Sequence, residues 1–154
     1  MSINPNIFRL YDIRGIAGEE FTAEEIKKYE KWYGPFPGIT LTSDAARLIG
    51  KAYGSIIRRQ GGRKVVVGYE IRPYAEELKR AFISGVLSSG CDVADAGVSL
   101  TPIIYFATAF FDFDGGGFRF RQEMKMAPGL SNAVLIPGPG RVLGMVAGPS
   151  FEVR

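Results

Sequence analysis

The chain has 154 residues, of which 46% are hydrophobic and 23% are charged, as is usual for a single soluble globular domain. Its net charge of +3 is small and its basic residues form no run, so we expect no nucleic-acid partner. With no histidine and one cysteine, the chain cannot build a Ser-His-Asp triad, a His-liganded zinc site or an internal disulfide.

The start of the chain and its lone cysteine bear on the cellular location of the protein. "MSINPNIFRLYDIRG" lacks the apolar run of a signal peptide, and no stretch reaches the ~18 apolar residues that a membrane span needs. Cys91 lies in the apolar, strand-like context "SSGCDVADAG", which favours a buried structural thiol. We therefore expect a cytoplasmic protein with no membrane partner.

The first predicted elements are a strand and a helix. "IFRLYDI" (residues 7–13) alternates apolar and polar residues, which predicts a short strand. Thr22 and Glu25 have the spacing of a capping box, which predicts that a helix begins there. The two prolines and two glycines of "YGPFPGI" (residues 33–39) end that helix.

The middle of the chain alternates helix and strand patterns. The most regular amphipathic stripe has helical spacing and consists of Ala45, Leu48, Ile49, Ala52, Tyr53, Ile56 and Ile57. "KVVVGY" (64–69) and "CDVADAG" (91–97) predict two strands, the first of them an apolar run typical of a buried parallel strand. Pro73 suits the first position of a helix between them, with Glu76 and Glu77 in its first turn. The buried face of that helix is predicted to hold Leu78, Ala81, Phe82 and Val86.

The last regular element before the tail is "PIIYFATAFF" (102–111). This segment is apolar all round, which predicts a helix packed on several sides. The order of elements predicts an α/β fold with a mixed, mainly parallel sheet and helices on both faces. In such sheets ligands gather at the carboxyl ends of the strands, which here means near residues 11–15, 68–72 and 96–101.

The C-terminal tail has a different character. Residues 117–154 are irregular and rich in glycine and proline, and "NAVLI" and "RVLGMV" are their best strand signals. "GPGRVLG" follows an apolar run as a dinucleotide fingerprint would, but Pro139 stiffens the turn and no helix pattern follows, so we reject that interpretation. We expect one domain over residues 1–116 and a divergent or frame-shifted tail over residues 117–154.

Three segments, in order, carry a family resemblance: "FRLYDIRG" (8–15), "VVVGYEIRPYAEELKRAF" and "DAGVSLTPIIYFA". Together they resemble the first domain of the α-D-phosphohexomutases, the phosphomannomutase and phosphoglucomutase superfamily. The matching family motifs are Phe-Arg-x-Tyr-Asp-Ile-Arg-Gly, Val-Gly-Arg-Asp-x-Arg-Pro and Gly-x-x-x-Thr-Pro. The resemblance covers about residues 4–116. It implies a domain I fold and an isomerase of carbohydrate metabolism, in which a phosphoserine gives its phosphoryl group to a hexose phosphate.

The resemblance also implies roles for residues of the first motif. Tyr11 and Arg14 are expected to bind the substrate by facing the phosphoryl group, with Arg14 just beyond the end of the first strand. A planar guanidinium can place two N–H groups on a phosphate, and a tyrosine hydroxyl can donate a further hydrogen bond. Arg9 and Asp12 are expected to be structural. For Arg72, bracing of the strand-to-helix turn and contact with a ligand both stay open.

The sequence departs from the family at several points. Tyr69-Glu70 replaces the usual Arg-Asp, and residues 31–43 look like an insertion in which Trp32 and Phe36 are expected to pack. After Asp-Gly-Gly the family continues into a Thr/Ser-x-Ser-His-Asn-Pro loop whose serine carries the phosphoryl group. This chain has no serine between Ser99 and Ser131. We interpret Ser131-Asn132 as a turn and assign no catalytic residue.

Mg²⁺ serves the intact family through an Asp-x-Asp-x-Asp loop in a later domain, and nothing in this chain corresponds to that loop. Asp112, Asp114 and Glu123 are scattered carboxylates that we expect to be solvated, so no specific metal site is predicted.

Two functional hypotheses remain. The first is an incomplete phosphohexomutase that binds hexose phosphate or inorganic phosphate weakly and is inactive by itself. The choice between mannose and glucose phosphates stays open. The second is a non-catalytic phosphate-binding or assembly module. In that case "FATAFF" and "AVLI" would be partly exposed and would favour self-association.

Overall fold

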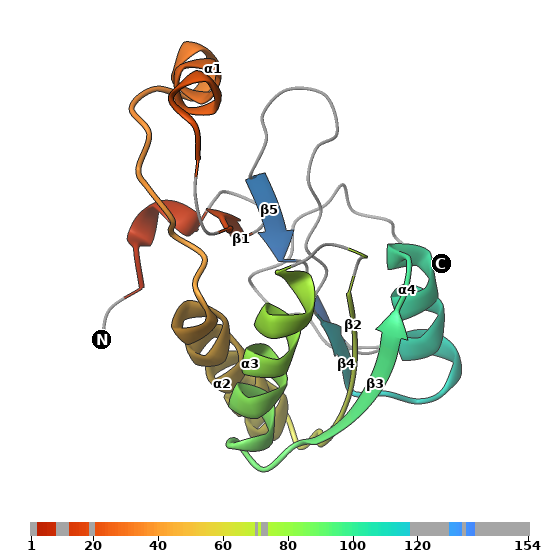
Figure 1. Ribbon diagram of the computed structural model, residues 1–154. Coiled ribbons are helices and arrows are strands. Elements are labelled where there is room, and N and C mark those ends of the chain that lie inside the picture. The colour runs from red at the N-terminus through yellow and green to blue at the C-terminus, as the bar shows by residue number, and fades with distance from the viewer. Residues whose placement is uncertain are drawn as a thin grey trace.

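The computed structural model describes residues 3–8, 13–18, 21–69, 71, 74–117, 130–133 and 135–137 (Figure 1). Its helices are the short 3₁₀ helix η1 (Pro5–Ile7) and the α-helices α1 (Ala23–Tyr33), α2 (Ser43–Arg59), α3 (Ala75–Leu87) and α4 (Thr101–Phe110). Its strands are β1 (Ile13–Ile16), β2 (Lys64–Tyr69), β3 (Asp92–Val98), β4 (Gly115–Gly117), β5 (Leu130–Ala133) and β6 (Leu135–Pro137).

A sheet with the strand order β3-β2-β4-β6 forms the centre of the fold. Strand β2 runs parallel to both β3 and β4, and β6 is antiparallel to β4. Strands β1 and β5 form a separate antiparallel pair, in which Ile13 lies opposite Ala133. The predicted α/β class with a mixed, mainly parallel sheet is therefore confirmed.

Alternate residues of β2 contact two different helix layers, as the two-residue period of a strand requires. Val65 and Val67 belong to the large core that α2 and α3 share, whereas Val66 packs with Ile104 and Ala107 of α4. In Figure 1, α2 and α3 lie on one side of the sheet and α4 lies on the other. The prediction of helices on both faces is confirmed.

Helices α2 and α3 approach each other at a distance that only glycine permits. A Cβ atom added to Gly50 would lie 2.2 Å from the carbonyl oxygen of Phe82, and one added to Gly85 would lie 2.0 Å from that of Arg47. The two backbones therefore meet without a side chain between them.

This close contact explains where the predicted stripe of α2 is wrong. Ala45, Ile49, Tyr53 and Ile57 are buried as predicted, but Ala52 is exposed. The buried set of α2 also includes Ala46, Gly50 and Gly54, which are four residues apart and form a ridge of small residues. A search for large apolar side chains misses such a ridge, because its small residues stabilise the fold by letting the backbones of α2 and α3 approach closely.

The predicted strand over residues 7–13 is wrong at its start. Ile7 ends η1, in which Pro5 occupies an early position and the Asn4 side chain accepts a hydrogen bond from the Asn6 N–H at 2.9 Å. A proline with fixed φ and an asparagine cap favour a helical turn here over an extended strand. The described strand β1 comprises Ile13–Ile16, and residues 9–12 of the predicted range lie outside the described residues.

Helix α1 follows its sequence signals at both ends. Thr22 and Glu25 form the predicted capping box, and Gly34 ends the helix with a φ of 83°. Phe36 packs edge-on against Tyr29, with 5.4 Å between the ring centroids, which agrees with its expected packing role. Trp32 does not, because 56% of it is exposed.

Helix α4 is buried along one face only, so the expected packing on several sides is wrong. Ile104, Ala107 and Thr108 are its buried residues, and Gly68 and Gly116 of the sheet let it approach closely. Ile103, Phe106 and Phe110 are exposed. Within the described residues, no helix has the length and apolar character that crossing a membrane requires.

The contact between α2 and α3 generates the first prediction. Replacing Gly85 by alanine should lower the free energy of unfolding by about 1–3 kcal/mol, because the new methyl group would overlap backbone atoms of α2. This loss should exceed the ~1 kcal/mol that alanine gains over glycine in a helix. Urea unfolding followed by circular dichroism measures the change. Ser84→Ala, at an exposed position next to it, is the matched control and should change stability by less than about 0.5 kcal/mol. Equal stability of Gly85→Ala and the wild type would contradict the close contact.

Candidate functional site

Of the two predicted binding residues, Tyr11 and Arg14, the structure describes the backbone of Arg14. It is the second residue of β1 and lies directly opposite Asn132 of β5. We expected it beyond the carboxyl end of the first strand, and this is wrong, because that strand runs on to Ile16. Tyr11, Arg9 and Asp12 lie outside the described residues, as do Glu70, Arg72 and Pro73. The binding roles assigned to Tyr11 and Arg14 therefore stay predictions.

The end of β1 is fixed by the segment that precedes α2. The N–H of Ile16 donates to the hydroxyl oxygen of Thr40 at 2.9 Å, and the carbonyl oxygen of Ile16 accepts the N–H groups of Thr40 and Leu41. A Cβ atom added to Gly15 would lie 2.6 Å from Cβ of Leu41, so this contact requires glycine next to Arg14. Sequence reasoning missed the buried Thr40, because its partner is distant in the chain.

Ser131 is not in a turn, as we had interpreted it. It belongs to β5 and lies opposite Gly15, one position along the ladder from the Arg14–Asn132 pair.

A lysine that the sequence pattern did not single out contacts both β2 and β3. Lys79 of α3 is only 6% exposed, and its Nζ lies 2.6 Å from Oδ2 of Asp95 in β3. The same Nζ lies 4.4 Å from the ring centroid of Tyr69, the last residue of β2. One ammonium group thus binds a helix to two strands beside one of the expected ligand regions.

The environment of Asp95 favours its ionised form. Burial raises the pKa of its carboxyl group, but the hydrogen bonds from Lys79 and from the Gly97 N–H, together with the charge of Lys79, outweigh burial. The pKa therefore lies below its ordinary value. The carboxylate accepts on both oxygens, Oδ2 from Lys79 and Oδ1 from Gly97 at 2.8 Å.

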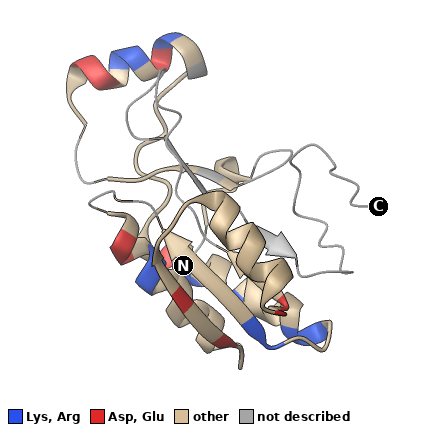
Figure 2. Ribbon diagram, turned by 90° about the vertical axis from the view of Figure 1, so that its right-hand side faces the viewer, with Lys and Arg blue, Asp and Glu red and all other residues tan. Residues whose placement is uncertain are grey.

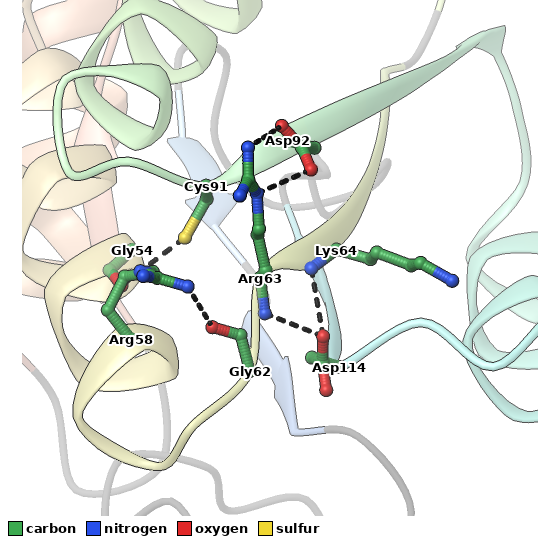
Figure 3. Close-up of polar contacts among 8 residues, drawn as sticks. All are labelled: Gly54, Arg58, Gly62, Arg63, Lys64, Cys91, Asp92 and Asp114. Carbon is green, nitrogen blue, oxygen red and sulfur yellow. Dashed lines mark hydrogen bonds and ion pairs between the residues drawn. The ribbon is translucent and has the colours of Figure 1, made fainter.

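The opposite, amino-terminal edge of the sheet is occupied by a structural polar cluster (Figure 3). Oδ2 of Asp114 accepts the N–H groups of Arg63 and Lys64 at 2.6 and 2.8 Å. Both oxygens of Asp92 accept from the guanidinium of Arg63. These contacts join the starts of β2, β3 and β4, so the acid of the Asp-Gly-Gly segment stabilises the sheet.

The same edge bears on metal binding and on the cysteine. Because Asp114 bonds two backbone amides, it is not the solvated loop acid that we expected, and Glu123 lies outside the described residues. Among the described residues, no group of three or more Cys, Asp or Glu side chains is arranged to hold a metal ion. Cys91 is buried as expected, its Sγ lies 3.4 Å from the carbonyl oxygen of Gly54, and burial raises its pKa.

Comparison with known proteins points to one family. The sequence pattern described as "Phosphoglucomutase/phosphomannomutase, alpha/beta/alpha domain I" matches residues 30–117. A phosphoglucomutase/phosphomannomutase of Thermococcus kodakarensis is 40% identical over 112 residues, which is 71% of this chain and 20% of that protein. A phosphomannomutase of Escherichia coli is 38% identical over 109 residues, 71% of this chain and 19% of its own length.

A solved structure agrees with the sequence matches. The crystal structure of a phosphoglucomutase/phosphomannomutase family protein from Burkholderia thailandensis superposes with a TM-score of 0.67 at 30% sequence identity. The superposition covers 88% of this chain and 27% of that protein. The chain therefore spans about a fifth of the length of the two sequence relatives and about a quarter of the solved structure.

The Lys79–Asp95 pair yields a prediction about pH. Asp95→Asn should lower the free energy of unfolding near neutral pH by about 1 kcal/mol, because it removes the carboxylate that accepts a hydrogen bond from the buried Nζ of Lys79. The expected loss of stability is small because the Asp95 side chain is 46% exposed, so solvent screens the ion pair. Since the pKa of Asp95 is lowered in the folded state, its contribution is present above the ordinary pKa of ~3.9 and is lost as the pH falls through the folded-state value.

Urea unfolding from pH 7 down to about pH 2 tests this expectation. The gap between wild type and Asp95→Asn should be constant above about pH 5 and should close below about pH 4. Asp92→Asn removes a more exposed ion pair and serves as the control, with a smaller loss. A gap that does not change with pH would show that the ionised carboxylate is not its source.

Proposed function

The chain belongs to the phosphoglucomutase/phosphomannomutase family, and on that premise we propose that it is a phosphate-binding phosphohexomutase domain without mutase activity of its own. The observation that carries the proposal is the family match over residues 30–117, which includes β2, β3 and β4 and ends with the last residue of β4. The reactive serine loop of the family would follow at that point. The division into a domain over residues 1–116 and a divergent tail is part of the same proposal.

The proposed ligand is a hexose phosphate or inorganic phosphate, held by Tyr11 and Arg14. The guanidinium of Arg14 would place two N–H groups on one phosphate, and the hydroxyl of Tyr11 would donate a third hydrogen bond.

The chemistry of the reaction explains the expected lack of turnover. In the family, a serine hydroxyl carries the phosphoryl group, gives it to the sugar phosphate and takes the other phosphoryl group back. This chain has no serine between Ser99 and Ser131 and no histidine. Tyr11 and Arg14 can orient a phosphate and neutralise its charge, but neither would accept its phosphorus atom by the family's route.

Mg²⁺ belongs to the intact family, and we expect none to bind specifically to this chain. The described acids near the candidate region do not form a ligand set, since Asp95 is paired with Lys79 and Asp114 bonds backbone amides at the other edge. No step of the proposed binding uses a metal ion. A cytoplasmic location stays a prediction from the sequence.

The proposal predicts weak binding of phosphate that depends on Arg14. Charge-assisted hydrogen bonds contribute about 1.5–3 kcal/mol each, and a single arginine and tyrosine should bind no tighter than about 1 mM, or ~4 kcal/mol. Titration of inorganic phosphate followed by amide NMR shifts should show changes around residues 11–15. Arg14→Ala should abolish those changes without unfolding the protein, whereas Arg9→Ala should lower stability first.

Arg59→Ala is the matched control for that titration. Arg59 is an exposed arginine at the end of α2. Its replacement should leave phosphate binding unchanged. Shifts that occur in another region, or that persist in Arg14→Ala, would show that the N-terminal motif acts here only as scaffold.

A second prediction from the proposal concerns activity. In a coupled assay with mannose and glucose phosphates and Mg²⁺, the chain should show no turnover above background. Active Escherichia coli phosphomannomutase serves as the positive control for the assay. Metal-dependent turnover well above background would overturn the proposed lack of activity, while leaving the phosphate titration to decide whether the binding site exists.

A further inference from the structure

The strand that contains Arg14 is not anchored by the four-stranded sheet. Within the described residues, β5 is the strand that pairs with β1, and neither belongs to the sheet β3-β2-β4-β6. One isolated bridge from Phe8 to Ile13 adds to this pairing. Two antiparallel strands alone are only marginally stable in water, so the position of β1 depends on further contacts.

Those contacts come from the segment between α1 and α2, where residues 31–43 look like an insertion in the sequence. Figures 1 and 2 show α1 away from the four-stranded sheet, and Figure 2 shows blue and red residues along this helix. Residues 34–42, which return from α1, contain no charged residue. They are tied to α1 at Phe36, whose N–H donates to Oε1 of Glu30 at 3.2 Å, and to β1 at Thr40. The insertion therefore connects α1 to β1.

The hydroxyl of Thr40 takes the place of a backbone acceptor. Thr40 is 7% exposed, and its Oγ1 accepts the N–H of Ile16 at 2.9 Å. The carbonyl oxygen of Ile16 accepts the N–H groups of Thr40 and Leu41 at 3.0 and 2.9 Å. In a regular ladder a backbone carbonyl accepts the N–H of a strand residue. Because a side chain does so here, the contact depends on the residue type at position 40.

The same segment also restrains the residue next to Arg14. A Cβ atom added to Gly15 would lie 2.6 Å from Cβ of Leu41 and 3.2 Å from Oγ1 of Thr40. Leu41 and Ile16 are both buried. The two residues that follow Arg14 in β1 therefore lie against one buried segment.

We propose that Thr40 is a positioning residue for Arg14, whose backbone it fixes by holding the end of β1. This inference rests on the proposed phosphate binding, since Thr40 acts through Arg14 and not by contact with the ligand. A planar guanidinium that makes two parallel hydrogen bonds to a phosphate requires a defined orientation. Binding groups must be held to within about 0.5 Å of their productive position, so a looser strand weakens both bonds.

The first test measures the backbone without phosphate, by amide hydrogen exchange. Thr40→Val should speed the exchange of residues 14–16 about tenfold or more relative to Val66 in the sheet, because a buried N–H loses its acceptor. Thr40→Ser keeps a hydroxyl and should restore slow exchange. Thr42→Val is the matched control, since the hydroxyl of Thr42 accepts the N–H of Ala45 and caps α2. In that variant the exchange of residues 14–16 should change no more than that of Val66.

The second test repeats the titration of inorganic phosphate with the same variants at constant ionic strength. Thr40→Val should raise the dissociation constant about three- to tenfold, because Arg14 is held less firmly. Thr40→Ser should bind phosphate as the wild type does. Thr42→Val should lose stability but keep the dissociation constant of the wild type. Circular dichroism confirms that the variants are folded, and Thr40→Ala replaces Thr40→Val if that variant is not.

Two results would overturn the role of Thr40. One is exchange of residues 14–16 that follows the exchange of Val66 in every variant. The other is a dissociation constant that Thr40→Val leaves unchanged, or that Thr42→Val raises equally, which would assign the effect to general stability. A wild-type protein that binds no phosphate would instead overturn the proposed function. The exchange comparison would then still decide whether Thr40 fixes the backbone of Arg14.

Discussion

The central position of β2 is the constraint on which the rest of the described structure depends. Both of its edges pair with parallel strands, and its residues from Val65 to Gly68 are buried. A strand in that position has no solvated side, so each face must be covered by a helix layer. Val65 and Val67 meet α2 and α3 on one face, while Val66 and Gly68 meet α4 on the other. The glycines that allow close helix contacts follow from the same need to fill this interior without voids.

The two ends of the parallel strands have different tasks. At the amino-terminal edge, Asp114 accepts the first N–H groups of β2 and Asp92 accepts from the guanidinium of Arg63. These bonds help to fix the register of the three strands. At the carboxyl edge, Lys79 joins α3 to β2 and β3. A ligand region needs fixed strand ends beneath loops that can differ, and this division supplies them. The stabilising contacts of the amino edge can therefore persist whatever chemistry the other edge performs.

The sequence predicted those features that depend on neighbours along the chain. The presence of β2, β3, α2 and α3, the capping box at Thr22 and the stop at Gly34 follow from local signals, and the structure confirms them. The sequence could not predict contacts that join distant segments, such as Ile16 with Thr40 or Lys79 with Asp95. The apolar composition of α4 led to the wrong prediction that it is packed on several sides, because composition does not tell how many elements cover a helix. Of the candidate site, the sequence named Arg14 through the family motif but misplaced the end of its strand.

The Asp-Gly-Gly segment shows how scaffold and chemistry separate in this chain. In the family that segment leads into the reactive loop, and here Asp114 accepts hydrogen bonds from the N–H groups of Arg63 and Lys64 at the start of β2. The glycines that follow form β4, pair with Val65 and Val66, and leave room for Thr108 and Ile104 of α4 above Gly116. Each of these requirements comes from packing around β2, and none needs a phosphoserine further along. The segment is therefore held in place by the fold itself, which explains how it can keep the family pattern while the residues after it do not.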